Sequence, residues 1–206
     1  MNFNFDLYEK AEAKEMGERE ALELGAHELV IMDAREYKSE ISGNVSLKVS
    51  VDIGGKDKQK GFFQKQYDNN TLSERKWPTG GVKYMSLKDE QLGFLKGFIT
   101  ALEKSNPNFK FNTKGTWEQL KGLKIAGQFG LEEYEKQDGS VGTTTKLVQF
   151  RSLDKLSEIT IPKVKKLDGS YVEYEKYQPT TNNNTNSNLE SLFANSPDVT
   201  TDELPF

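Results

Sequence analysis

The chain has 206 residues, of which 34% are hydrophobic and 29% charged, and it contains no cysteine and a single histidine. The lack of cysteine excludes disulfides and thiolate metal ligands, and the lone histidine, His27, excludes most zinc sites and histidine-based active sites. The sequence has no run of about 20 apolar residues and no apolar leader, so we expect a cytoplasmic protein without membrane contact.

Charge is distributed unevenly along the chain, although the net charge is only −4. Residues 1–34 carry nine acidic and three basic residues, whereas residues 35–83 carry six acidic and ten basic ones. Residues 178–206 carry four acidic residues and no basic one. A local basic surface is therefore compatible with the acidic composition, and we expect it to come from residues 35–83.

The first predicted elements are an acidic arm and three strands. Residues 1–25 indicate an arm or helix that is rich in glutamate. The apolar run at residues 27–34 is typical of a strand, and residues 44–53 alternate valine, leucine and isoleucine with polar residues. Residues 61–67, "GFFQKQY", follow a turn cluster and are predicted as the third strand.

A helix and a hairpin follow. The segment from Ser86 to Asn106 has leucine and isoleucine at helical spacing, an N-cap signal at its start and Asn-Pro at its end. Residues 124–135 and 145–152 flank an Asp-Gly turn and are predicted as a β-hairpin. Residues 157–177 are expected to add an edge strand or to wrap around the body.

Three strands, one helix and two strands is the element order of an OB-fold. We therefore predict a mostly β protein with an OB-fold domain over residues 26–177, a five-stranded barrel with one helix between strands three and four. The arm at residues 1–25 precedes this domain, and a disordered acidic tail at residues 178–206 follows it. The same element order also fits other small α+β domains.

An OB barrel that binds unpaired strands needs aromatic rings for bases to stack on and cations that follow the phosphates. Taken singly, a strand aromatic is more often core and a lysine more often plain surface, so the hypothesis depends on their being gathered together. Because neighbours on a strand point to opposite faces, we expect one of Phe62 and Phe63 to be exposed or covered by another segment. The candidate DNA-binding residues are Lys48, Lys60, Phe62, Phe63, Lys65, Tyr67, Arg75, Lys76, Trp77, Lys83 and Tyr84.

The best candidates for catalysis are Asp33, Glu36 and Lys38 in "DAREYK", because carboxylates in such patterns hold metal ions in nucleases. The pattern is short and arises readily in a chain that is 29% charged. No glycine-rich phosphate loop is present. We therefore expect no enzymatic activity, no metal and no cofactor, and we keep a metal-dependent nuclease as a rival hypothesis.

The last part of the chain divides into a linker and a tip. The stretch "PTTNNNTNSN" (179–188) cannot bury enough apolar area to offset the entropy of ordering it, which predicts a flexible linker. The tip combines carboxylates with a hydrophobe and Pro-Phe, which suits a partner with an apolar pocket and a basic rim. The predicted partner-binding residues are Asp202, Glu203, Leu204, Pro205 and Phe206.

The tip closely resembles the acidic tip that closes bacterial single-stranded DNA-binding proteins, and it likewise follows a polar linker and an OB-like body. The body is more similar to the single-strand binding proteins encoded by phages and mobile elements of Gram-positive bacteria. This resemblance spans most of residues 1–170. It is carried by "MNFNFDL", "HELVIMDAREYKSEISGNVSLKVSVDI", "KWPTGGVKY", "LGFLKGFITALEKSNP" and "IPKVKKLDG".

The resemblance implies sequence-independent binding of single-stranded DNA during replication, recombination or repair, with the tip recruiting partner proteins. Two alternatives stay open: a protein-interaction adaptor that makes no DNA contact, and a recombination annealing protein without a main strand-coating role. The sequence also leaves open whether the chain is a monomer or a homodimer, and which aromatic residues stack on bases.

Overall fold

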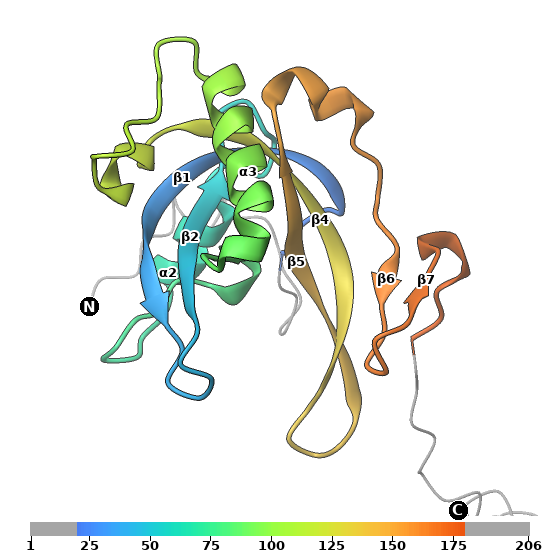
Figure 1. Ribbon diagram of the computed structural model, residues 1–206. Helices are drawn as coiled ribbons and strands as arrows, with labels where there is room; N and C mark the ends of the chain where they lie inside the picture. The colour runs from blue at the N-terminus through green and yellow to red at the C-terminus, as the bar shows by residue number, and fades with distance from the viewer. Residues whose placement is uncertain (1–19, 180–206) are drawn as a thin grey trace, which may run out of the picture. The chain divides into compact units, whose positions relative to one another are not determined.

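The computed structural model describes residues 20–179 (Figure 1). Most of the predicted arm, and nearly all of the predicted tail with its tip, lie outside the described residues. The elements in chain order are β1 (Gly25–Lys38), β2 (Val45–Ile53), α2 (Phe62–Asp68), β3 (Val82–Ser86), α3 (Leu92–Ser105), β4 (Lys124–Glu135), β5 (Val141–Arg151), β6 (Val164–Lys165) and β7 (Tyr171–Val172). Short 3₁₀ turns lie at Thr79–Gly81 (η1), Asp89–Gln91 (η2), Trp117–Leu120 (η3), Leu153–Glu158 (η4) and Tyr174–Lys176 (η5).

The strands form one open sheet. The structure is mostly β, as predicted. The ladder order is β3-β2-β1-β4-β6-β7, and β5 pairs with β4. β1 runs antiparallel to β2 from Leu29 to Lys38 and to β4 from Gly25 to Val30, and β3 runs antiparallel to β2. Among the described residues no ladder joins β3 to β5, so these ladders do not show a closed five-stranded barrel.

The chain divides into two compact units. Among the described residues, unit 1 comprises residues 20–130 and 145–161, and unit 2 comprises residues 131–144 and 162–179. The strands of the β4–β5 hairpin therefore contribute residues to both units, and this hairpin confirms the sequence prediction.

Alternating apolar residues of the first two strands build the core of unit 1. Leu29, Ile31, Leu47 and Val49 are completely buried, and they pack with residues of α2, α3 and β4. Burial of such side chains contributes roughly 25 cal/mol per Å² of apolar area. Both predicted strands are confirmed, although Val45, which begins β2, is 39% exposed.

The predicted third strand is wrong, because residues 62–68 form the helix α2. The carboxylate of Asp52, buried in β2, accepts hydrogen bonds from the backbone N–H groups of Phe63 (2.9 Å) and Gln64 (3.3 Å). These N–H groups belong to the first helical turn and have no partner within the helix. Helical geometry also lets Phe62 and Phe63 both face the core, at 7% and 3% exposure, so neither side chain is left exposed.

The third strand lies later in the chain, at β3, where no strand was predicted. The chain reaches β3 through Gly81, where an added Cβ would lie 2.8 Å from the ring of Phe63 and 2.9 Å from the carbonyl oxygen of Val51. A side chain has no room at this position. The glycine therefore allows the backbone to pass directly over the core before it pairs with β2.

The predicted helix is confirmed as α3, with a shorter N-terminal end. The helix begins at Leu92 after the turn η2, whereas the predicted N-cap, Ser86, is the last residue of β3. Leu102 is completely buried, but Leu92 is 42% exposed. Asn106 ends the helix as expected, and its side-chain amide donates to the carbonyl oxygen of Leu102 at 2.8 Å.

Residues 21–24, which the sequence assigns to the N-terminal arm, pack onto unit 1. Leu22 is buried in its core, and the side-chain amide of Gln59 bonds to the backbone at residues 21 and 23, each at 2.8 Å. His27, buried near the start of β1, lies 2.9 Å from the carboxylate of Asp57. These contacts tie the start of the sheet to the loop that precedes α2.

Unit 2 contains the far part of the β4–β5 hairpin and the small hairpin β6–β7, which confirms the expected added strand. Glu133 is buried and accepts hydrogen bonds from the backbone N–H of Leu167 and the hydroxyl of Tyr177, both at 3.0 Å. Burial and the hydrogen bond to Glu133 raise the pKa of Tyr177 to about 12. Among residues 20–179, no helix has the length and apolar character needed to cross a bilayer.

Candidate nucleic-acid interface

One side of the sheet formed by β1, β2 and β3 carries basic and aromatic residues in register. Arg35 pairs with Lys48, and Lys48 pairs with Tyr84, so the three side chains form one row across the strands. Tyr37 is two residues beyond Arg35 and therefore lies on the same side. We call Arg35, Tyr37, Lys48 and Tyr84 the outward face, because the opposite side carries buried residues such as Ala34 and Val49.

The aromatic rings of the outward face are exposed and close together. Tyr37 and Tyr84 are 41% and 49% exposed, and their ring centroids are 5.3 Å apart. The ammonium group of Lys48 lies 6.0 Å from the centroid of Tyr84. Exposed rings beside a cation are the two features that single-strand binding surfaces combine, because bases stack on the rings and phosphates pair with the cations.

Unit 1 is positively charged as a whole, and two further cations lie near Lys48. The described residues of unit 1 carry 20 Lys and Arg against 16 Asp and Glu, a net charge of +4. Burial, followed by the positive charges of Arg35 and Lys76, lowers the pKa of Lys48, and only Asp33 opposes this shift. An anion bound here would relieve the repulsion among these cations.

A second aromatic cluster contains three of the predicted residues. The rings of Tyr67, from α2, and Trp77 lie 5.5 Å apart with an interplanar angle of 34°, and the guanidinium of Arg75 lies 5.3 Å from the centroid of Tyr67. The indole N–H of Trp77 donates to the carbonyl oxygen of Val51 at 3.0 Å. Trp77 is half-buried, so this bond fixes one edge of the indole against the core. Lys76, its neighbour, is exposed and acts on the charge of Lys48.

The remaining predicted DNA-binding residues lie outside these two clusters. Phe62 and Phe63 belong to the core, which corrects their assignment as DNA-binding residues. Lys83 points to the side opposite Tyr84, where its ammonium group donates to the carbonyl oxygen of Val148 at 2.7 Å. Lys60 and Lys65 are exposed.

Arg35 and Tyr37 were missed from the sequence as members of this site. They lie in "DAREYK", the last part of β1, after a register shift between Ile31 and Asp33 that reverses which side of the sheet the following residues face. Alternation extended from the buried Leu29 and Ile31 would have placed Arg35 and Tyr37 on the core side, so the sequence pattern alone could not have found them.

The nuclease candidates are engaged with other side chains. Asp33 forms an ion pair with Arg35 at 3.4 Å, and Glu36 accepts a hydrogen bond from the indole N–H of Trp117 at 3.2 Å. Within residues 20–179, no group of three or more His, Cys, Asp or Glu side chains is arranged to hold a metal ion.

Comparison of the chain with protein-family models and with curated proteins found no match.

Proposed function

We propose that this protein binds single-stranded DNA without reading its sequence, through the outward face and the neighbouring cluster of Tyr67, Arg75 and Trp77. The observation that carries the proposal is the cross-strand row of Arg35, Lys48 and Tyr84, with Tyr37 against Tyr84. Lys48, Arg35 and Lys76 neutralise phosphates and release counterions, and the tyrosines stack on bases. Stacking requires only the face of a base, so binding is tolerant of sequence.

We further propose that unit 1 is a partly open OB-fold. The neighbour order β3-β2-β1-β4-β5 supports this, since it is the order of an OB barrel opened between its third and fifth strands. Two contacts lie across that opening: Lys83 bonds to the carbonyl oxygen of Val148, and a Cβ on Gly80 would lie 2.8 Å from the carbonyl oxygen of Thr145. Lys48 and Tyr84 of the outward face also lie on the second and third strands, where OB-folds bind oligonucleotides.

In this proposal the protein is a non-catalytic cytoplasmic factor in DNA replication, recombination or repair. The tip, Asp202–Phe206, recruits partner proteins by placing phenylalanine in an apolar pocket and carboxylates on a basic rim. This part of the proposal is supported by the sequence alone, because the tip lies outside the described residues.

The test is the binding of a fluorescent oligo(dT) and of a matched duplex, followed by anisotropy. We expect the full-length protein to prefer the single strand, and Lys48→Glu to weaken its binding about 10-fold or more, because it replaces a phosphate contact with repulsion. Lys114→Glu is the matched control, since Lys114 is exposed and belongs to neither aromatic cluster.

Three other outcomes separate the rivals. An adaptor would bind neither DNA. A nuclease would cut the oligonucleotide with magnesium and lose this activity in Glu36→Ala. An annealing protein would bind single strands and also speed the pairing of complementary ones, which a strand-annealing assay measures.

A further inference from the structure

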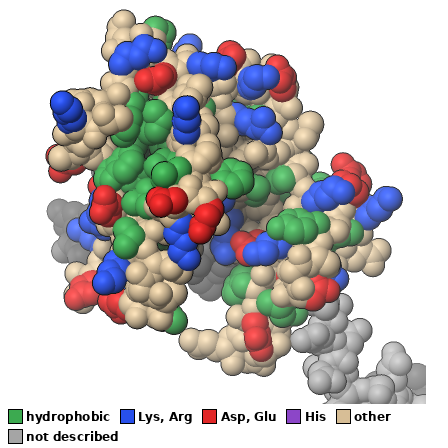
Figure 2. Space-filling model, in the orientation of Figure 1, with side chains coloured by type: hydrophobic (Ala, Val, Ile, Leu, Met, Phe, Trp, Pro, Cys, Tyr) green, Lys and Arg blue, Asp and Glu red, His purple; other side chains and the backbone are tan. Residues whose placement is uncertain are grey.

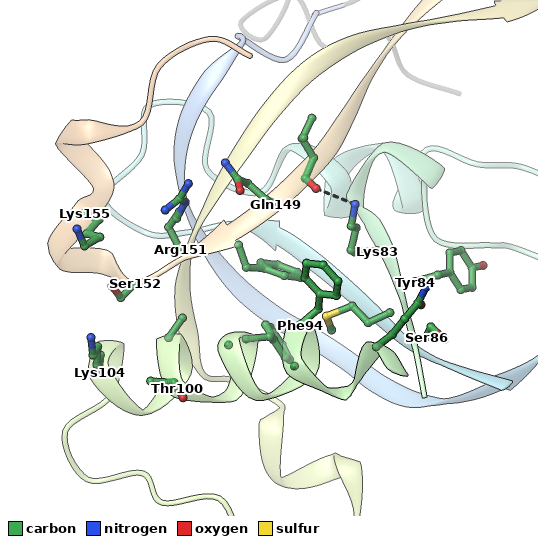
Figure 3. Close-up of a pocket in the computed structure, with 18 residues that line it drawn as sticks. Lys83, Tyr84, Ser86, Phe94, Thr100, Lys104, Gln149, Arg151, Ser152 and Lys155 are labelled. Carbon is green, nitrogen blue, oxygen red and sulfur yellow. Dashed lines mark hydrogen bonds between the residues drawn. The ribbon is translucent and has the colours of Figure 1, made fainter. Parts of the chain in front are cut away.

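A groove of about 720 Å³ lies in unit 1 between α3 and the facing ends of β3 and β5 (Figure 3). Met85, Phe98 and Phe150 are among its apolar lining residues, and the rings of Phe98 and Phe150 lie 4.7 Å apart. Phe94, on α3, also lines the groove and is 79% exposed. An aromatic ring with this exposure is available to a ligand.

The groove is basic. Its lining contains Lys83, Lys104, Arg151 and Lys155 and no acidic residue. Two carboxylates lie close by: Glu158 pairs with Lys155 at 3.2 Å, and the exposed Asp154 interacts with Lys104 and Lys155. The cations still outnumber the carboxylates, and Figure 3 shows Lys104, Arg151 and Lys155 together at one end of the groove.

The groove borders the outward face. Tyr84 belongs to the row of Arg35 and Lys48, and it also lines the groove. Ser86, two residues further along β3, also lines the groove. In Figure 3 Tyr84 lies at the end of the groove opposite the three cations. A chain that leaves the outward face at Tyr84 therefore meets the groove next, and the basic end after it.

The surface of α3 leaves room for such a chain. No heavy atom lies within 4 Å of the position of a Cβ at Gly93 or Gly97, and both glycines line the groove. Hydrophobic side chains gather over α3 on the face seen in Figure 2, with both basic and acidic side chains around them. Leu92 and Phe94 of α3 are both exposed.

We propose that the groove is a second segment of the single-stranded DNA site. The strand passes from the outward face over Tyr84, stacks a base on Phe94, and places phosphates against Lys104 and Arg151. This inference rests on the proposed function. Single-stranded DNA fits better than an acidic peptide because one continuous polyanion accounts for the cations, the exposed ring and the continuity with the outward face.

The test uses full-length protein and oligo(dT) from about 4 to about 16 nucleotides, the range that single OB-folds occupy. Phe94→Ala and Arg151→Glu should leave the affinity for the shortest oligonucleotides within about 2-fold of wild type. Each should weaken binding of the longest ones by about 5-fold or more: Phe94→Ala because a stacked base is lost, and Arg151→Glu because a phosphate contact is replaced by repulsion. Both residues are exposed, so folding is preserved, and Lys114→Glu is the control.

Phe94→Trp adds a local reporter, because tryptophan keeps a stacking surface and is quenched by a stacked base. We expect this variant to show more quenching than wild type, which has Trp77 and Trp117, only with the longer oligonucleotides. Unchanged affinity of both variants for all lengths, without added quenching, would overturn the inference. Binding of an acidic peptide such as residues 198–206 to the groove in place of DNA would also overturn it.

These outcomes separate the two proposals. If no oligonucleotide binds at any length, the proposed function itself is wrong. If short oligonucleotides bind and depend on Lys48, while long ones gain nothing from Phe94 or Arg151, only the groove is wrongly assigned.

Discussion

Replacement of the exposed tyrosines on the outward face tests their role as stacking surfaces. Tyr84→Ala removes a ring that is 49% exposed and lies 5.3 Å from Tyr37. Stacking of a base on an aromatic residue contributes about 1–3 kcal/mol, so we expect the Kd for oligo(dT) to rise about 5- to 150-fold. Tyr84→Trp keeps a stacking surface and should stay near the wild-type affinity.

The two tyrosines touch, so their effects should couple. The double variant Tyr37→Ala, Tyr84→Ala should lose less binding free energy than the sum of the single losses, because each ring helps to position the other. The assay is anisotropy of labelled oligo(dT) at one fixed salt concentration, with thermal unfolding as a check on the fold. Tyr171→Ala is the matched control, because Tyr171 is 64% exposed and lies in unit 2. An effect of Tyr84→Ala no larger than that of the control would refute the stacking role.

Three further predictions concern stability. Asp52→Ala should lower the free energy of unfolding by about 2–4 kcal/mol, because the N–H groups of α2 lose their buried acceptor. Urea titrations followed by circular dichroism measure this change, and a loss below about 0.5 kcal/mol would contradict the role of Asp52. Gly81→Ala should lower the free energy of unfolding by about 1–3 kcal/mol, because its methyl group would clash with Phe63. Gly93→Ala has open space around it and should raise the free energy of unfolding by about 0.5–1 kcal/mol. Equal effects of the two substitutions would be inconsistent with the packing described. In the folded protein Tyr177 has a pKa of about 12, whereas an unfolded tyrosine loses its proton near pH 10. The contribution of Tyr177 to stability is therefore complete below about pH 10 and is lost as the pH rises toward 12. Absorbance titration at 295 nm should show a late component that is missing in Tyr177→Phe, and an unchanged curve would contradict the bond to Glu133.

The strands β1 and β2, the helix α3 and the β4–β5 hairpin were predictable because their signals are local. Alternation, helical spacing and an Asp-Gly turn each depend on residues close in sequence. The helix α2 was not predictable in this way. Its segment is too short for a periodicity to decide between strand and helix, and its first turn depends on Asp52, which lies 11 residues before Phe63.

The candidate site was only partly predictable for a similar reason. Lys48, Trp77 and Tyr84 stood out by residue type, but the outward face depends on the register that places Arg35, Lys48 and Tyr84 in one row. The strand β3 has only five residues and pairs with a strand more than 30 positions earlier, so its local pattern carries little signal. Without β3, the sequence could not place Tyr84 beside Tyr37.

The most direct test of the central claim is a titration of the full-length protein with oligo(dT) at low and high salt, followed by tryptophan emission. Trp77 lies within the proposed interface, with its ring 5.5 Å from that of Tyr67. We predict quenching of the tryptophan emission at low salt. The logarithm of the association constant should fall linearly with log[salt], with a slope of about −0.7 for each phosphate contact. A protein that leaves oligo(dT) unbound at low ionic strength, with unchanged emission, would contradict the account.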